Sequence, residues 1–364
     1  MILHREKSIW DVAVNECMQR EKAKDDADKE SSLEGAESNV LIMGSKDAGK
    51  TSLILRFLEK EEKPKATIAL EYTFGRKAKG HNMNKDIVHI WELGGGTSLS
   101  QLIEVPISKS TLLNCSIILV LDLSEPNKLW YTAETLLKAA QDRVEAVIRK
   151  ASAQNPKIYE EIKSRAWKRI GEQHPDRDVL DPFPLPMVIL GMKYDLFQNL
   201  ESEKRKLIAR TLRFLAHNYG ASLQFCSSKM ENLMSKGKQQ LGHLAFGTSV
   251  SIKQGVQDHN KPISITAGSD GMDVIGLPPV KGDDIGRGNA RTPLELWKQA
   301  FTAVFPQEAV EKEMAADPSK DPQYRESAVD NVRAQKDKEL EKYKKKLERK
   351  AKTNQLAGQM GDVS

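Results

Sequence analysis

An eight-residue segment near the start of the chain limits its possible fold more than any other feature. The segment is Gly44-Ser45-Lys46-Asp47-Ala48-Gly49-Lys50-Thr51, and it matches the pattern G-x-x-x-x-G-K-[ST] at every fixed position. An apolar run at 40–43 precedes it, and apolar side chains at helical spacing follow it at 53–58. This order predicts a strand, a glycine loop and a helix, whose backbone N–H groups and helix dipole hold phosphate oxygens.

Individual residues of this loop have separate expected roles. The predicted phosphate-binding residues are Gly44, Ser45, Lys46, Asp47, Ala48, Gly49, Lys50, Thr51 and Ser52. Lys50 is expected to reach the terminal phosphates, and the Thr51 hydroxyl is expected to hold Mg²⁺. The alternative is a glycine turn that binds no ligand.

Further short apolar runs have the character of strands buried on both faces. They lie at 87–91, 117–123 and 187–190, with a weaker one at 222–225. Helical patterns at 129–153, 199–218 and 230–245 separate or follow them. Alternating strands and helices predict an α/β fold with a doubly wound, mostly parallel sheet, in which ligands bind at the carboxyl ends of the strands.

A second candidate motif follows the strand predicted at 87–91. It reads Trp91-Glu92-Leu93-Gly94-Gly95-Gly96, where small GTPases carry Asp-x-x-Gly on the Mg²⁺ side of the site. We therefore predict Glu92, with Thr51, as a magnesium ligand, although glutamate is one methylene longer than aspartate. The alternative is a strand-end acid that faces solvent.

Two later segments resemble the base-reading motifs of small GTPases. Met192-Lys193-Tyr194-Asp195 matches Asn-Lys-x-Asp except at Met192, and Cys226-Ser227-Ser228-Lys229 is close to Ser-Ala-Lys. Together with the loop, they predict a Ras-like P-loop domain that binds a guanine nucleotide through Lys193, Asp195, Ser228 and Lys229. Loss of the asparagine is expected to weaken guanine affinity and specificity.

Hydrolysis has little support in the sequence, and no catalytic residue is predicted. Gly96 stands where GTPases usually place the glutamine that orients the attacking water. Lys46 replaces a usually small residue beside the γ-phosphate. Thr67 is either a threonine that senses this phosphate or an ordinary strand-edge residue. A kinase-like ATP-binding enzyme is a weaker alternative, because no arginine-bearing lid is evident and Lys193-Tyr194-Asp195 argues against it.

Composition and charge exclude other classes. The net charge of +5 is spread along the chain, and no run reaches the length of a membrane helix, so we expect neither nucleic-acid binding nor membrane insertion. The three cysteines have no zinc-site spacing and are expected to be free thiols in a reducing cytosol. His174-Pro175-Asp176 is interpreted as a loop, because no metal-ligand partner stands at a suitable spacing.

The chain is expected to have four parts. They are an N-terminal helix and polar linker (1–37), the P-loop domain (38–246, with an insertion at about 154–186), a C-terminal extension (247–325), and a charged helix with a disordered tail (326–364). A short amphipathic helix at 294–305 carries Trp297, Phe301 and Phe305. These aromatic residues are predicted either to anchor a partner or to pack on the chain's own domain.

Several of these motifs together resemble one family. Gly44–Thr51, Ala69–Arg76 and Trp91–Gly96 are similar to dynein light intermediate chains. The likeness to those of cytoplasmic dynein 2, the motor of retrograde intraflagellar transport, is carried by Ala78–Asn82, Lys193–Asp195, Leu212–His217 and Asp321–Tyr324.

The resemblance implies a non-catalytic subunit. Its Ras-like domain would dock on and stabilise the dynein-2 heavy chain, beside the other dynein-2 subunits, with an indirect association with microtubules. It would act in the cytoplasm and at the cilium axoneme, basal body and centrosomal region, in cilium assembly. The extension would wrap the domain and contact the heavy chain. The competing interpretation is a GTPase-like switch that regulates ciliary transport.

Overall fold

The computed structural model of the 364-residue chain describes residues 36–78, 85–250, 255–278, 292–308 and 325–361. Side chains are described as far as residue 350. The chain divides into two units, Met1–Val310 and Glu311–Ser364. The predicted N-terminal helix and linker lie outside the described residues.

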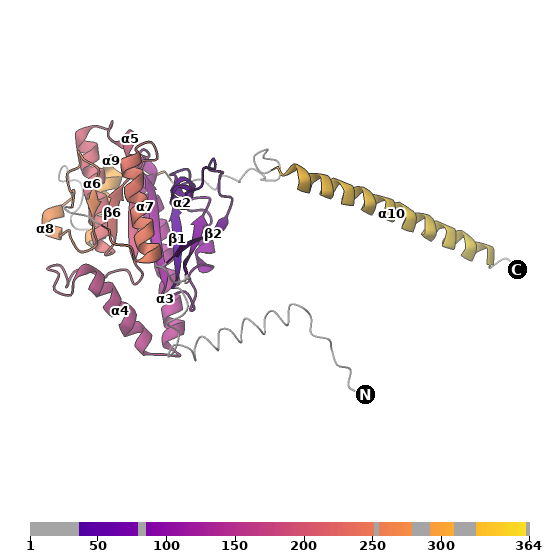
Figure 1. The fold of residues 1–364 in the computed structure, drawn as a ribbon, viewed down its shortest axis with the longest axis horizontal. Helices are drawn as coiled ribbons and strands as arrows, with labels where there is room; N and C mark the ends of the chain where they lie inside the picture. Colours follow the sequence, from indigo (N-terminus) through magenta and orange to yellow (C-terminus); the bar gives the residue numbers. More distant parts are fainter. Residues whose placement is uncertain (1–35, 79–84, 251–254, 279–291, 309–324, 362–364) are drawn as a thin grey trace. The chain divides into compact units, whose positions relative to one another are not determined.

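One mixed sheet forms the centre of the first unit (Figure 1). Within the described residues it has seven strands in the order β2-β3-β1-β4-β5-β6-β7. Their bounds are β1 Glu37–Gly44, β2 Leu70–Ala78, β3 Lys85–Leu93, β4 Cys115–Asp122, β5 Met187–Met192, β6 Ser222–Phe225 and β7 Ser264–Ile265. Strands β3, β1, β4, β5 and β6 are mutually parallel, which confirms the predicted doubly wound α/β sheet.

The two outer strands run antiparallel and were not predicted. β2 pairs with β3 from Leu70↔Leu93 to Ala78↔Lys85, and β7 pairs with β6 at Leu223↔Ile265. β2 is an edge strand with exposed aromatic side chains, so it lacks the continuous apolar run of a buried strand. β7 has only two residues and is too short to leave a periodic signal.

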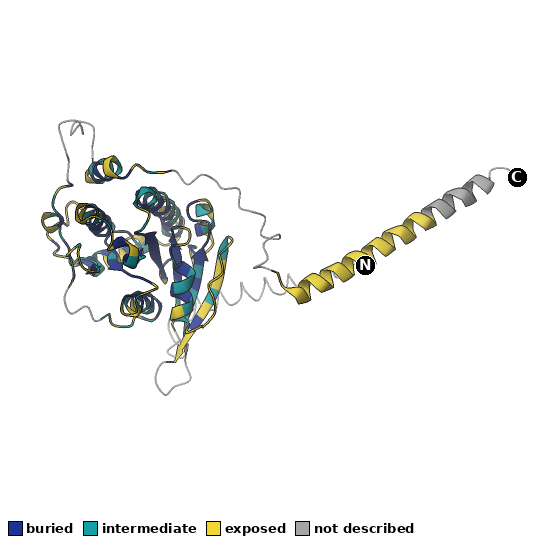
Figure 2. Ribbon diagram, turned by 90° about the horizontal axis from the view of Figure 1, so that it is seen from above, coloured by how far each residue is buried: buried dark blue, intermediate teal, exposed yellow. Residues whose placement is uncertain are grey.

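Helices cover both faces of the sheet (Figure 2). They are α2 Lys50–Phe57, α3 Pro126–Ser152, α4 Lys157–Ile170, α5 Tyr194–Phe197, α6 Ser202–Asn218, α7 Glu231–Phe246, α8 Met272–Ile275 and α9 Pro293–Val304, with a 3-10 turn η1 at Ser100–Glu104. Successive residues of β1 belong to different cores. Leu41 and Met43 pack with α3, α6 and α9, whereas Val40 and Ile42 pack with α2 and α7. Strand alternation thus gives the sheet one apolar core on each face.

The segment after α7 completes the core that contains α3 and α6. β7 extends the sheet, and Trp297 of α9 stacks on Phe214 of α6 with ring centroids 5.2 Å apart. Phe301 packs against Trp130 of α3 at 6.0 Å, and Phe305 is buried beside it. The anchor hypothesis for these aromatic residues is therefore wrong, because their side chains are buried in the chain's own domain.

The second unit contains α10, Ser327–Gly361. Every described side chain of this helix is exposed, as expected for a sequence rich in Lys and Glu with few apolar positions. Among the described residues, no helix is long and apolar enough to span a membrane. Cys115 and Cys226 are buried free thiols, and burial raises the pKa of each to about 12, which leaves them unreactive.

Candidate nucleotide-binding site

The loop between β1 and α2 has glycine at two positions where the backbone favours it. Gly44 has φ +149°, and a Cβ there would lie 1.8 Å from the Val120 carbonyl oxygen of β4. The Ser45 N–H donates to that same carbonyl at 2.9 Å. Gly49, at φ +96°, caps the start of α2. The two glycines of the motif thus set the close approach to β4 and the turn into the helix.

Lys50 is folded back over this loop. Its Nζ lies 2.8 Å from the Ser45 carbonyl oxygen and 3.4 Å from that of Gly44. Burial lowers the pKa of Lys50, and the nearby carboxylates of Glu92 and Asp47 oppose that change. A cation held among backbone carbonyls within the loop lies where the terminal phosphates of a nucleotide are predicted to bind.

Thr51 and Glu92 come together, as the predicted magnesium site requires. The Thr51 hydroxyl donates to Glu92 Oε1 at 2.7 Å. Glu92 is 4 % exposed, so the alternative of a solvent-facing acid is wrong. Burial raises the pKa of Glu92, while hydrogen bonds from Thr51 and Thr67 and the charge of Lys50 lower it.

Two other residues discussed for hydrolysis also line this end of the site. A Cβ on Gly96 would stand 3.6 Å from the Lys46 backbone nitrogen, so the glycine run after β3 lies against the loop. Gly96 offers no side chain that could orient water there. The Thr67 hydroxyl lies beside Glu92 and 3.3 Å from Glu71 Oε2, at the edge of the same site.

At the base end, Asp195 is held by two donors. Ser227 Oγ donates to Asp195 Oδ1 at 2.5 Å, and Lys229 Nζ lies 3.3 Å from Oδ2. Burial would raise the pKa of Asp195, but these hydrogen bonds outweigh it and the pKa is lowered. Ser227 is fully buried and Ser228 is exposed, so the serine that orders Asp195 is the residue before the predicted one. Ser227 could have been identified from the sequence, because it is the serine two residues before Lys229, as in the Ser-Ala-Lys motif.

Lys193 contacts an acid that the sequence analysis missed. Its backbone is left-handed, with φ +61°, and its Nζ lies 2.5 Å from Asp122 Oδ2. Asp122 ends β4 and is buried, and its Oδ1 accepts the Ser124 N–H at 2.9 Å. The sequence did offer a signal for Asp122, because it is the acidic residue that ends the apolar run of β4.

Met192 occupies the asparagine position of the base-reading motif. It is 1 % exposed, and its Cε would lie 3.3 Å from a Cβ placed on Gly49. The amide that would link the base loop to the phosphate loop is therefore replaced by an apolar contact. The two loops still touch, but without a directional hydrogen bond at this point.

Comparisons with known proteins identify the family. The model of the dynein light intermediate chain family matches residues 5–176. The cytoplasmic dynein 2 light intermediate chain 1 of Bos taurus is 49% identical over 340 residues, which cover 93% of this chain and 95% of the relative. Its Danio rerio counterpart is 48% identical over 93% of this chain and 94% of its own. The chain belongs to the dynein light intermediate chain family.

The fold agrees with that of the family. A crystal structure of the conserved domain of a dynein light intermediate chain matches with a TM-score of 0.52 at 15% identity, and covers 73% of this chain and 98% of the other. The motifs that carry the family resemblance form much of β2, the end of β3 and the C-terminal half of α6. Residues 79–82 and 321–324 lie outside the described residues.

Proposed function

We propose that this chain is a non-catalytic accessory subunit of the cytoplasmic dynein 2 motor. It binds and stabilises the heavy chain for retrograde intraflagellar transport and cilium assembly. The observation that carries the proposal is the 49% identity to cytoplasmic dynein 2 light intermediate chain 1 along 93% of the chain. Its partners are the heavy chain and the other dynein-2 subunits, and it reaches microtubules through the motor. It works in the cytoplasm and at the cilium axoneme, basal body and centrosomal region.

The P-loop in this proposal binds a guanine nucleotide without turning it over. Lys50 and the loop amides bind phosphate, Asp195 and Lys229 hold the base, and Thr51 with Glu92 offers the hard oxygen donors that Mg²⁺ prefers. The ion supplies charge neutralisation at the phosphates. Gly96 provides no group to orient water, which supports a pseudo-GTPase.

The second candidate is a nucleotide-dependent switch of ciliary transport. Thr67 favours it, because this threonine lies beside Glu92 at the edge of the predicted magnesium site. A threonine in this position is able to sense a γ-phosphate and to order the segment before β2.

The test compares nucleotide content and heavy-chain association in the full chain. Lys50→Ala removes the cation of the loop, and Lys60→Ala, an exposed lysine after α2, is the matched control. Nucleotide is released by denaturation and identified by chromatography, and each variant is co-expressed with the dynein-2 heavy chain. We expect near-stoichiometric guanine nucleotide in the wild type and in Lys60→Ala, its loss in Lys50→Ala, and heavy-chain recovery with all three.

The outcomes separate the candidates. Heavy-chain recovery that depends on Lys50, with an unchanged melting temperature, would favour the switch. Failure of the wild-type chain to recover the heavy chain would refute the accessory-subunit proposal. GTP turnover by the wild type that Lys50→Ala abolishes would refute the pseudo-GTPase assignment.

A further inference from the structure

Three potential metal ligands meet between the loop after α4 and the end of α6. They are His174 and Asp176, in the loop after α4, and His217, in the last turn of α6. One ligand-type atom from each lies within 4.8 Å of the other two. The sequence shows no partner for His174 at metal-ligand spacing, and folding supplies one from a distant helix. His174-Pro175-Asp176 does lie in a loop, as predicted, and the structure adds His217 beside it.

Both imidazoles approach the same carboxylate oxygen. His217 Nε2 lies 2.7 Å from Asp176 Oδ2, and His174 Nδ1 lies 4.0 Å from it. The two rings are 5.2 Å apart between centroids. Around a tetrahedral zinc ion with bonds of about 2.1 Å, ligand atoms stand about 3.4 Å apart. The two distances to Asp176 lie on either side of this value, and the third pair of ligand atoms lies within 4.8 Å, so the three side chains need to move by only about 1–1.5 Å.

The hydrogen bonds around the cluster fix the tautomer of His174. Its Nε2 lies 3.0 Å from the Asp270 carbonyl oxygen, which can only accept, so Nε2 carries the proton. Its Nδ1 is unprotonated and accepts the Asp176 backbone N–H at 3.1 Å, a hydrogen bond that a metal ion bound at Nδ1 replaces. A ring N–H bonded to a backbone carbonyl with the opposite nitrogen free of a proton is the arrangement of most zinc-bound histidines.

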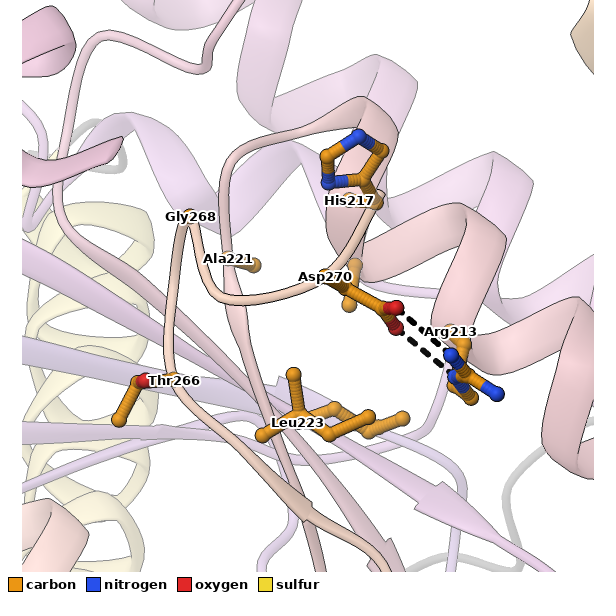
Figure 3. Close-up of a pocket in the computed structure, with 9 residues that line it drawn as sticks. Arg213, His217, Ala221, Leu223, Thr266, Gly268 and Asp270 are labelled. Carbon is orange, nitrogen blue, oxygen red and sulfur yellow. Dashed lines mark hydrogen bonds and ion pairs between the residues drawn. The ribbon is translucent and has the colours of Figure 1, made fainter. Parts of the chain in front are cut away.

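The surrounding charges also suit a cation. Arg213 forms two hydrogen bonds with the Asp270 carboxylate, at 2.6 and 2.8 Å, so these two charges cancel (Figure 3). The Asp176 carboxylate has no such cationic side chain among its contacts within the described residues. Its neighbours are the imidazoles of His174 and His217, and its Oδ2 accepts the Met272 N–H at 2.9 Å. All three side chains are mostly buried, at 6%, 16% and 2% exposure for His174, Asp176 and His217. A buried carboxylate beside two imidazoles is stabilised when a divalent ion replaces the shared proton.

A small pocket borders the cluster. His217, Arg213 and Asp270 line it together with Gly268 (Figure 3). Gly268 has φ +73°, and a Cβ there would meet the Ile170 carbonyl oxygen at 2.0 Å, so the 266–271 segment is pressed against the end of α4. Of the three proposed ligands, His217 lines this pocket, so the pocket reaches the cluster from the α6 side.

We propose that His174, Asp176 and His217 bind a zinc ion. Nδ1 of His174, Oδ2 of Asp176 and Nε2 of His217 are the ligands, and water completes the tetrahedron. The ion ties the loop after α4 to α6, and through the Asp270 and Met272 contacts it also holds the segment that leads to α9. Two imidazoles and one carboxylate favour Zn²⁺ over Mg²⁺ or Ca²⁺, which prefer oxygen ligands.

The test uses the purified full-length chain, stripped with EDTA and dialysed against zinc chloride alone. We expect about one retained zinc ion per chain by mass spectrometry, and a melting temperature that rises with zinc. His174→Gln and Asp176→Asn are expected to abolish both effects. His259→Gln is the matched control, because His259 forms a surface pair with Asp258 at 3.8 Å and is expected to change neither.

Cobalt substitution of the unmutated chain covers the case in which a variant fails to fold. Tetrahedral Co²⁺ bound by nitrogen and oxygen gives visible d–d absorption without a thiolate charge-transfer band. Absence of retained zinc in the wild type, zinc retention in the folded His174→Gln or Asp176→Asn chain, or a thiolate band in the cobalt spectrum would each overturn the proposal. A cluster that acts only as a hydrogen-bonded clasp would show the first of these results.

Discussion

The two ends of the candidate nucleotide site are built in different ways. At the phosphate end, Gly44, Lys50, Thr51 and Glu92 are joined by close polar contacts that follow directly from the motif. At the base end, Met192 replaces a polar link with an apolar one. The phosphate end thus keeps the glycines, the lysine and the threonine of its loop motif, and the base end keeps only part of its own motif.

The two ends of the site have different expected roles: the phosphate end would bind any nucleotide, and the base end would distinguish one nucleotide from another. Phosphate binding uses backbone amides and one cation, which any nucleoside phosphate satisfies. Guanine recognition depends on the Asp195 carboxylate, which Ser227 and Lys229 already engage. We therefore expect a site of this kind to retain a ligand that stabilises the fold and to select only weakly among nucleotides.

The largest expected effect comes from breaking the phosphate end. Gly44→Ala places a methyl group 1.8 Å from the Val120 carbonyl oxygen, at φ +149°. We expect the free energy of unfolding to fall by about 4 kcal/mol, measured by urea titration. Gly171→Ala is the control, because φ is +109° there but nothing lies within 4 Å of the added carbon. Its expected loss is about 1 kcal/mol, and equal losses in both variants would contradict the steric explanation.

The next effect breaks the base end. Lys193→Ala leaves the buried Asp122 carboxylate without its cation, 2.5 Å away in the wild type. The Ser124 hydrogen bonds to Asp122 remain, so we expect a loss of about 2 kcal/mol in unfolding free energy. Lys229→Ala removes an exposed lysine from the same end and should cost under about 0.5 kcal/mol. A larger loss in Lys229→Ala than in Lys193→Ala would mean that Asp122 does not need the ion pair.

A smaller effect distinguishes the two serines of the base end. Ser227→Ala removes the buried donor to Asp195 and should lower the unfolding free energy by about 1 kcal/mol. Ser228→Ala changes an exposed side chain and should stay within about 0.5 kcal/mol of the wild type. Thermal melts of the two variants, run side by side, compare them directly. The reverse order of effects would restore Ser228 as the functional residue.

The smallest effect appears only as a change with pH. Burial raises the pKa of Glu92 above its ordinary value of 4.5, so the folded state binds this proton more tightly than the unfolded state. The stabilisation this gives is complete below pH 4.5 and is lost as pH rises through the raised pKa. Glu92→Gln keeps an acceptor for Thr51 but has no charge.

The melting temperature of Glu92→Gln relative to the wild type should therefore increase from about pH 4.5 upward and then level off. The scan is run without nucleotide or Mg²⁺. A difference that is constant across the range would show that Glu92 is ionised to the same extent in both states.

The parallel part of the fold was readable from the sequence because each buried strand is a continuous apolar run. β4, buried at every position, is the clearest case. β2 was missed because exposed side chains on both of its faces, among them Glu71, Tyr72 and Lys77, interrupt that run. β7 was missed because two residues carry no periodicity, and its pairing with β6 depends on a contact across the chain.

Site residues could be predicted from the sequence where they form one continuous motif. They could not be predicted where the contact joins residues far apart in the sequence. Gly44 to Thr51 form one continuous motif, so their roles could be assigned without a structure. The Lys193–Asp122 pair and the His174–His217 pair join residues from different elements. No spacing rule relates such residues, since the sheet order brings them together.

The C-terminal segment has a consequence for synthesis on the ribosome. Trp297, Phe301 and Phe305 fill the core beneath α3 and α6, so most of the nascent chain emerges before that core is closed. Domains tend to fold from the N-terminus as they emerge, and exposed apolar faces attract chaperones. We therefore expect the α3 and α6 surfaces to stay uncovered until the residues up to Phe305 have emerged from the ribosome.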